Sequence, residues 1–311
     1  MNIKNCGICE HELTAQITIR EMQLGLREDF SYGVCSNCGC IQIMEVPSQL
    51  EKYYPDYYGP FNAKAPLLRK LPFFKRLVKG IRIKRKYKQG DVTLLNYLKP
   101  IGTNTRAKIL DIGCGNGVLI CHLYNLGFYN VEGVDKFLPQ EIDYGHGVKV
   151  MKKDLPEFKS KNYDVLMMHH VLEHIAEQAE ILNECHRLLK DTGSLLVRVP
   201  VVGEAYKIYS EEWVQLDAPR HLFIHTLKSM TILAQKTGFK IQEVIYDSGS
   251  FQFTGSEMYK KGIPLFDPVS QKPNDREQYF SKKEIDDFEK LAVRLNENGT
   301  GDQAIFYLSK A

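Results

Sequence analysis

The sequence has no apolar run long enough to cross a membrane, because a spanning helix needs roughly 20 consecutive apolar residues. Its first six residues, MNIKNC, also lack the apolar core of a secretory signal. We therefore expect a cytoplasmic protein whose eight cysteines are reduced thiols or metal ligands rather than disulfides. A net charge of +3 is too small to indicate nucleic-acid binding by itself, so a nucleic-acid partner is not expected.

Two C-x-x-C pairs lie near the N-terminus, and four thiolates complete a closed tetrahedral zinc site. The four cysteines are Cys6, Cys9, Cys35 and Cys38. Between and after the pairs, the residues of Thr14–Ile19 and Ile41–Met44 alternate as strands do. We predict a zinc ribbon over residues 1–46, in which Cys40 or His11 could replace a ligand. The alternative is two unrelated reduced pairs, or one redox pair.

A connector over residues 47–90 is first aromatic and broken by prolines, and then basic. Basic and apolar residues are interleaved over residues 64–88, which is typical of an amphipathic helix. We favour a helix that covers the next domain and exposes its basic face to water. The alternative is a helix that binds a phosphorylated substrate or an anionic membrane surface, which would place the protein at the inner membrane face.

The remainder, residues 91–311, alternates apolar strands with amphipathic helices, which predicts an α/β fold with a doubly wound, mostly parallel sheet. Seven strands are expected, at Lys108–Asp111, Val131–Asp135, Val148–Met151, Tyr163–Met168, Ser194–Val199, Lys240–Tyr246 and Gln303–Leu308. A polar amphipathic helix near Lys282–Leu295 belongs to a helical insertion over about residues 250–300, interpreted as a lid or dimer element.

A glycine-rich turn follows the first of these strands, where the ligands of such sheets bind. Its residues of interest are Asp111, Gly113, Gly115 and Gly117. The glycines permit a close approach of the backbone to a ligand. Val118 and Ile120 occupy the places where the third glycine of a dinucleotide fingerprint would fall, which disfavours NAD. About 20 residues further on, Asp135 ends the second strand, where a ribose would be bound.

The order and spacing of these segments resemble the class I S-adenosylmethionine (SAM) dependent methyltransferases, which have a Rossmann-like fold. The matching motifs are LDIGCGNG at 110–117, VEGVD at 131–135, DL at 154–155, YDVLMMHHVLEHI at 163–175 and LLKDTGSLLVRVP at 188–200. The resemblance implies that the glycine turn holds the methionine part of SAM and that Asp111 faces its ammonium group. It also implies that Asp135 binds the ribose and that Asp154 and Leu155 flank the adenine, with His169 beside the cofactor.

Methyl transfer to a hydroxyl needs a positioned base, and histidine has a suitable pKa. After the fourth strand, His170 and His174 would share a face if the segment were helical. The segment HVLEH differs from the metal motif HExxH, so no metal is expected there. A loop after the fifth strand adds His221. We predict His221 as the general base, with His170 as second choice, and His174 as a substrate contact.

The same loop holds the only tryptophan, Trp213, and a Pro-Arg-His turn, and loops at this end of a sheet often carry function. We predict substrate contacts for Trp213 and Arg220. Arg220 can bind a phosphate or carboxylate in bidentate fashion, and the alternative is an ion pair with Asp217 or Glu212.

The segment WVQLDAPRH at 213–221 is similar to a loop of a bacterial methyltransferase subgroup associated with sugar and surface-polysaccharide pathways. That subgroup also carries an N-terminal cysteine-rich ribbon and an Asp-Gln-Ala segment, matched here at 302–304. The resemblance implies a small acceptor, a nucleotide-linked or lipid-linked sugar. Two alternatives remain: a zinc-ribbon RNA methyltransferase, favoured by the basic stretch, and a non-catalytic SAM-binding scaffold.

Overall fold

The structure is a computed structural model, and it describes residues 4–55, 57, 64–68, 93–159 and 162–311. The basic helix predicted within residues 64–88 falls almost entirely outside the described residues, as does much of the connector over 47–90. Among the described residues, no helix combines the length and apolarity needed to cross a bilayer.

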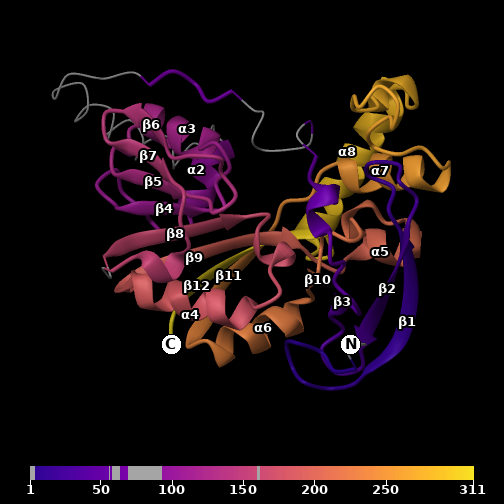
Figure 1. The fold of residues 1–311 in the computed structure, drawn as a ribbon, viewed down its shortest axis with the longest axis horizontal. Coiled ribbons are helices and arrows are strands. Elements are labelled where there is room, and N and C mark those ends of the chain that lie inside the picture. The colour runs from indigo at the N-terminus through magenta and orange to yellow at the C-terminus, as the bar shows by residue number, and fades with distance from the viewer. Residues whose placement is uncertain (1–3, 56, 58–63, 69–92, 160–161) are drawn as a thin grey trace.

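The described residues form two sheets, and the larger has eight strands in the order β11-β12-β9-β8-β4-β5-β7-β6 (Figure 1). Their bounds are β4 Ile109–Ile112, β5 Val131–Val134, β6 Ile142–Gly145, β7 Val148–Met151, β8 Tyr163–His169, β9 Leu189–Pro200, β11 Phe239–Tyr246 and β12 Gln303–Lys310. The five central strands, β9-β8-β4-β5-β7, run parallel to one another. The α/β fold with a mostly parallel sheet is therefore confirmed.

All seven predicted strands are present, and β12 lies antiparallel between β9 and β11. The sheet also has an eighth strand, β6, that the sequence prediction missed. It pairs antiparallel with β7 at the edge of the sheet. Its sequence, IDYG, is short and half-exposed, so it has no run of apolar residues to mark it as a strand.

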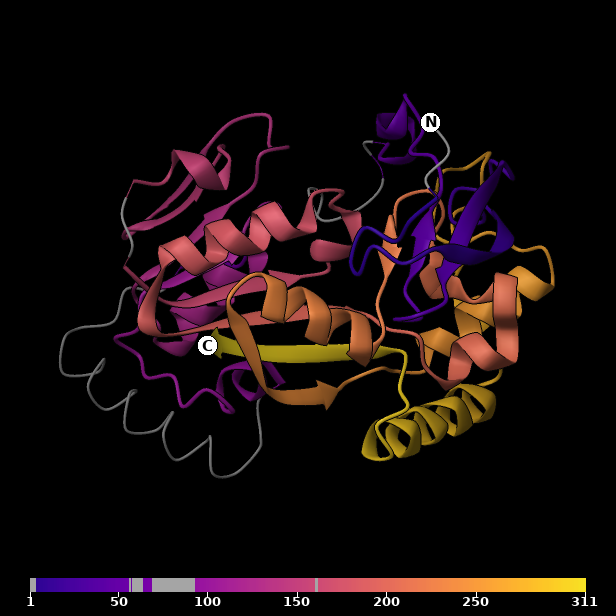
Figure 2. The same cartoon turned by 90° about the horizontal axis from the view of Figure 1, so that it is seen from below.

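Successive residues of a strand pack alternately into two separate hydrophobic cores, one on each face of the sheet. In β4, Ile109 packs into one core and Leu110 into the other. The first core also contains residues of α2 (Thr93–Leu98) and α3 (Val118–Leu126). The second contains residues of α4 (Gln178–Leu188) and α6 (Leu227–Lys236), which cross their face side by side (Figure 2). This is the period-two pattern of a sheet covered on both faces.

The smaller sheet has the order β1-β2-β3-β10. Three of its strands come from the cysteine-rich segment: β1 Leu13–Arg20, β2 Asp29–Cys35 and β3 Ile41–Ile43. The fourth, β10 (Phe223–Ile224), directly follows the Pro-Arg-His turn and pairs antiparallel with β3. The N-terminal segment therefore shares a sheet with the loop that carries the predicted general base.

The remaining elements connect the two sheets or cover their ends. They are the α-helices α5 Glu204–Tyr209, α7 Phe251–Lys260 and α8 Lys282–Glu297, and the 3-10 helices η1 Leu50–Tyr53, η2 Leu155–Glu157, η3 Leu172–His174, η4 Ser210–Glu212, η5 Val214–Leu216 and η6 Arg276–Gln278. Helix α8 is the amphipathic helix predicted within residues 250–300, and a capping box at Ser281 and Glu284 fixes its start.

Candidate functional site

The glycine turn joins β4 to α3 at the carboxyl edge of the sheet. Gly113, Gly115 and Gly117 have φ angles of +67°, +54° and +78°, which other L-residues adopt only with strain. A Cβ atom on Gly113 would lie 2.5 Å from the Val171 side chain, and one on Gly117 would lie 2.5 Å from Val150. The backbone conformation and the packing therefore both require glycine at these two positions.

Two carboxylates flank this turn. The carboxylate of Asp135, just beyond β5, accepts hydrogen bonds from the backbone N–H groups of Gly115 and Phe137, both at 2.9 Å. Asp111 lies in β4 and is buried. Burial, reinforced by the negative charge of Asp135, raises the pKa of Asp111 to about 8. A buried carboxyl group of this kind favours a cation beside it.

The predicted adenine contacts lie at the next strand ends. Leu155 is buried, whereas the side chain of Asp154 is 54% exposed and lies 3.6 Å from the ammonium of Lys136. At the end of β8, the His169 ring stacks at a tilt on Tyr97, with 5.1 Å between centroids. Burial lowers the pKa of His169 to about 3, so this ring is neutral. The turn, Asp135 and His169 therefore share one edge of the sheet.

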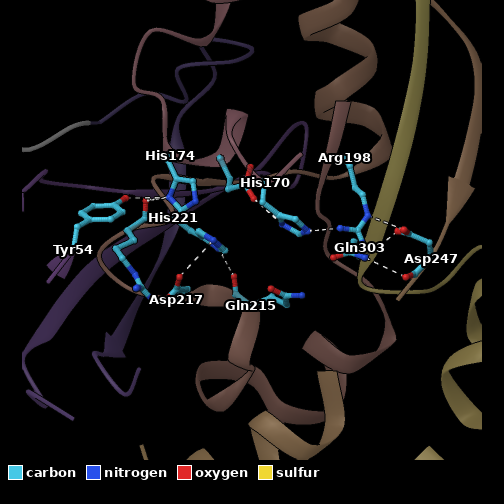
Figure 3. Close-up of polar contacts among 11 residues, drawn as sticks. Tyr54, His170, His174, Arg198, Gln215, Asp217, His221, Asp247 and Gln303 are labelled. Carbon is cyan, nitrogen blue, oxygen red and sulfur yellow. Dashed lines mark hydrogen bonds and ion pairs between the residues drawn. The ribbon is translucent and has the colours of Figure 1, made fainter. Parts of the chain in front are cut away.

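A second cluster forms where the segment after β8 meets the loop before β10 (Figure 3). The rings of His174 and His221 lie edge to face, with 4.8 Å between their centroids. Glu173, which lies between His170 and His174 in the sequence, is fully buried. Its Oε1 lies 3.1 Å from Nδ1 of His170. Because Val171 contacts Gly113, this cluster begins next to the glycine turn.

His170 is held on both sides of its ring. Its Nε2 lies 2.8 Å from Nη1 of Arg198, which can only donate, so this nitrogen accepts. Its Nδ1 therefore carries the proton and donates to Glu173. The Arg198 guanidinium also donates to Asp247 at 2.6 Å, and Asp247 accepts from Gln303 at 2.9 Å (Figure 3). His170 has φ +55° and precedes a 3-10 helix, so the condition for a shared α-helical face with His174 is not met.

His174 and His221 have the same tautomer. Nδ1 of His174 lies 2.9 Å from the carbonyl of Arg220, and Nδ1 of His221 lies 2.7 Å from the carbonyl of Gln215. A carbonyl only accepts, so Nδ1 carries the proton in each ring and Nε2 keeps a lone pair. Nε2 of His221 lies 3.5 Å from Oδ2 of Asp217. Burial lowers the pKa of His174 to about 4, which keeps its ring neutral.

Two predicted substrate contacts lie in the interior. Trp213 is fully buried, and its indole N–H donates to Asp302 at 2.8 Å. Arg220 is 1% exposed and forms an ion pair with Asp217, which is the alternative considered for it. Neither side chain is exposed to an acceptor in this structure, since both are buried against other parts of the chain. The sequence could not show this, because Asp302 lies 89 residues from Trp213.

The four predicted zinc ligands come together at one end of the small sheet. One Sγ atom from each of Cys6, Cys9, Cys35 and Cys38 lies within 4.8 Å of the others. Backbone N–H groups of Ile8 and Cys38 point at Sγ of Cys6 and Cys35, both at 3.4 Å. Such a group is compatible with a tetrahedral ion, in which zinc–sulfur bonds are about 2.3 Å long.

Sequence reasoning missed Glu173 and Arg198 as parts of the site. The position of Glu173 in HVLEH excludes the motif HExxH, and no role in the site is predicted for this residue from the sequence. Its place between two histidines was nevertheless visible in the sequence. Arg198 interrupts the buried apolar run that ends β9, and a charged residue within such a run is a signal that a partner exists.

Comparison with known proteins matches residues 83–244 to a family described as "Methyltransferase domain". A ubiquinone biosynthesis O-methyltransferase of Maricaulis maris is 32% identical over 143 residues, covering 40% of this chain and 55% of that protein. A tRNA U34 carboxymethyltransferase of a Geobacter species is 24% identical over 239 residues, covering 71% and 67%. The chain thus spans about half the length of the first of these relatives and two thirds of the second.

Among solved structures, a putative sarcosine dimethylglycine methyltransferase from Galdieria sulphuraria aligns with a TM-score of 0.45 and 14% identity. The alignment covers 79% of this chain and 94% of that one.

Proposed function

Because this chain belongs to the methyltransferase-domain family, we propose that it transfers a methyl group from SAM to a small hydroxyl-bearing acceptor. The observation that carries the proposal is the turn Gly113–Gly117, whose three left-handed glycines bring the backbone beside two carboxylates at the edge of the sheet where the ligands of such folds bind.

The residues of this edge fit SAM group by group. Both carboxylate oxygens of Asp135 accept backbone bonds and retain lone pairs for the two ribose hydroxyls. The buried carboxyl group of Asp111 suits the ammonium of the methionine part, because a neighbouring cation favours its ionised form. When bound, SAM supplies an electrophilic methyl group on a sulfonium. The protein has to hold the acceptor in line with it.

Of the two predicted general bases, His221 fits better than His170. Both nitrogens of His170 are engaged, by Arg198 and by Glu173. Nε2 of His221 keeps a lone pair, and Asp217 lies near enough to stabilise a proton taken there. His174, which is partly exposed, contacts the His221 ring edge to face. We therefore propose that the acceptor's hydroxyl binds at the His174–His221 pair.

A nucleotide-linked or lipid-linked sugar remains the narrower proposal for the acceptor, and it rests on the loop at 213–221 alone. Arg220 is buried and paired with Asp217, so the phosphate contact predicted for it no longer supports a nucleotide-linked or lipid-linked acceptor. The relatives point elsewhere: one is named for ubiquinone biosynthesis and another for tRNA. The test of the function must therefore offer the chain acceptors of all three classes: linked sugars, ubiquinone intermediates and tRNA.

We also propose that Cys6, Cys9, Cys35 and Cys38 bind one structural Zn²⁺ ion. The support is the convergence of the four sulfur atoms and the N–H groups directed at two of them. Metal analysis of the purified chain tests this. About one zinc per chain is expected, whereas a disulfide or no metal would contradict it.

The test of the function is transfer of labelled methyl from SAM to sugar nucleotides, to hydroxyl-bearing intermediates of ubiquinone biosynthesis and to tRNA. Label in a small hydroxyl compound supports the proposal. Label in tRNA alone would establish the RNA alternative instead. SAM binding without transfer to any of the three classes would favour the scaffold alternative.

A further inference from the structure

The Glu173–His174–His221 group has the make-up of a metal site, which the sequence did not predict. We propose that these three side chains bind a divalent transition-metal ion. One ligand atom from each residue lies within 4.8 Å of the other two. Around a single ion with bonds of about 2.1 Å, ligand atoms lie roughly 3–4 Å apart. Small side-chain rotations therefore suffice to close the site.

Each of the three side chains is oriented by a second contact, as metal ligands are in proteins. The Nδ1–H groups of His174 and His221 donate to main-chain carbonyls, so both Nε2 lone pairs are available. Oε1 of Glu173 accepts from His170, which leaves Oε2 as the ligand atom. His170 is thereby a positioning residue, fixed in turn by Arg198.

One polar atom of this group, Oε2 of Glu173, has no donor or cation beside it in the described part of the chain. Glu173 is 0% exposed, and its Oε2 has no hydrogen-bond partner among the described residues. A buried carboxylate oxygen without a donor is costly. A cation between the three ligands would give this oxygen the positive partner that it lacks.

The ligand set selects the kind of ion. Two imidazoles and one carboxylate suit Zn²⁺, Fe²⁺ or Co²⁺, whereas Mg²⁺ and Ca²⁺ prefer oxygen ligands. Three protein ligands also leave a coordination position open, as catalytic zinc sites do. His174 is partly exposed, so one of the three ligands lies at the protein surface.

The role of the ion rests on the proposed function. An acceptor hydroxyl bound at the open position ionises more readily, and its proton passes to water. The resulting oxygen anion then forms the new bond to the methyl carbon as the carbon–sulfur bond of SAM breaks, leaving a neutral thioether. When the ion is bound, Nε2 of His221 is one of its ligands and does not act as the general base. The ion then activates the acceptor hydroxyl in place of the histidine.

The experiment is a Co²⁺ titration of the full chain after its cysteine cluster has been filled with Zn²⁺, without SAM. The expected result is saturable visible absorption from about one Co²⁺ per chain, without the near-ultraviolet band of cobalt–thiolate bonds. Glu173→Gln and His174→Gln should each weaken Co²⁺ binding at least about tenfold. The exposed His122→Gln on α3 is the matched control and should bind as the wild type does.

Absence of the saturable absorption in the wild-type chain would overturn the proposal, as would unchanged affinity in both variants. If Glu173→Gln fails to fold because the residue is buried, His174→Gln decides alone, since its side chain is partly exposed. SAM binding is measured separately on the same samples. Failure of the metal site is thus distinguished from failure of the methyltransferase proposal.

Discussion

The hydroxyl of Tyr32 donates a hydrogen bond to the main-chain carbonyl of His221 across 2.9 Å. Tyr32 lies on β2 of the cysteine-rich segment and is fully buried, whereas His221 belongs to the loop at the proposed active site. Nearby, the N–H of Ile43 donates to the carbonyl of Leu222 at 3.0 Å. The cysteine-rich segment thus holds the loop in place, so a metal bound there as proposed would support the active site without contacting it.

Tyr32→Phe should uncouple these two parts. The substitution leaves the buried carbonyl of His221 without its donor, at a cost of about 1–3 kcal/mol in the free energy of unfolding. Denaturant titration measures this loss, and methyl transfer should fall with it. Tyr279→Phe, at a partly exposed tyrosine, is the control and should change neither. Equal stability of the Tyr32 variant and the wild type would mean that the bond does not hold the loop.

Gly113→Ala should abolish SAM binding and destabilise the fold. Its Cβ would lie 2.5 Å from Val171, and its φ of +67° adds strain of about 1–2 kcal/mol. Gly145→Ala is the matched control, because Gly145 has φ +77° but no atom within 4 Å of the new Cβ. Calorimetric SAM titration should therefore show normal affinity for the control. Similar losses of SAM binding in both variants would show that strain alone is responsible.

SAM binding near neutral pH should release a proton from Asp111. Its pKa in the folded chain is about 8, above the ordinary 3.8, so the group is protonated at pH 7 and ionises when a cation arrives. The observed binding enthalpy should then depend on the ionisation enthalpy of the buffer, corresponding to up to about one proton. Asp111→Asn should remove that dependence. A wild-type enthalpy that is the same in all buffers would contradict the assignment.

The same pKa predicts how the SAM-free chain responds to pH. Because the folded-state pKa is raised, the stability contributed by protonated Asp111 is fully present below about pH 4. It is lost as the pH rises towards 8. Thermal unfolding of the wild type and Asp111→Asn across this range should therefore converge at low pH and diverge as the pH rises, with the asparagine variant the more stable. Parallel curves would refute the pKa assignment.

Trp213→Phe should reduce stability without changing acceptor affinity. The indole N–H is a partner of buried Asp302, and its loss leaves that carboxyl group short of a donor, costing about 1–3 kcal/mol. Steady-state kinetics should show an unchanged KM for the acceptor. A raised KM with unchanged stability would restore the sequence-based interpretation of Trp213 as a substrate contact.

Local patterns were enough to predict most of the sheet. The strands β4, β5 and β8 are short segments with buried apolar residues, and acidic, glycine or histidine residues lie at or just beyond their ends, so both their positions and their ligand-binding ends were visible in the sequence. Strand β10 was not visible, because two residues of β-structure form only by pairing with β3, nearly two hundred residues earlier.

The roles of single side chains depended on partners far away in the chain. His170 looked like a free base until the structure placed Arg198, on the neighbouring strand, against its Nε2. Arg220, by contrast, had its partner three residues away in Asp217, and the sequence did suggest that pairing as the alternative. Non-local contacts therefore decide which polar residues are free to act.

The most direct test of the central claim is calorimetric titration of the chain with SAM and, separately, with NAD. The account predicts saturable SAM binding, no NAD binding, and at least about tenfold weaker SAM binding by Asp135→Asn, since an amide offers the ribose hydroxyls a poorer acceptor. Absence of SAM binding by the wild-type chain, or binding of NAD in its place, would contradict the claim.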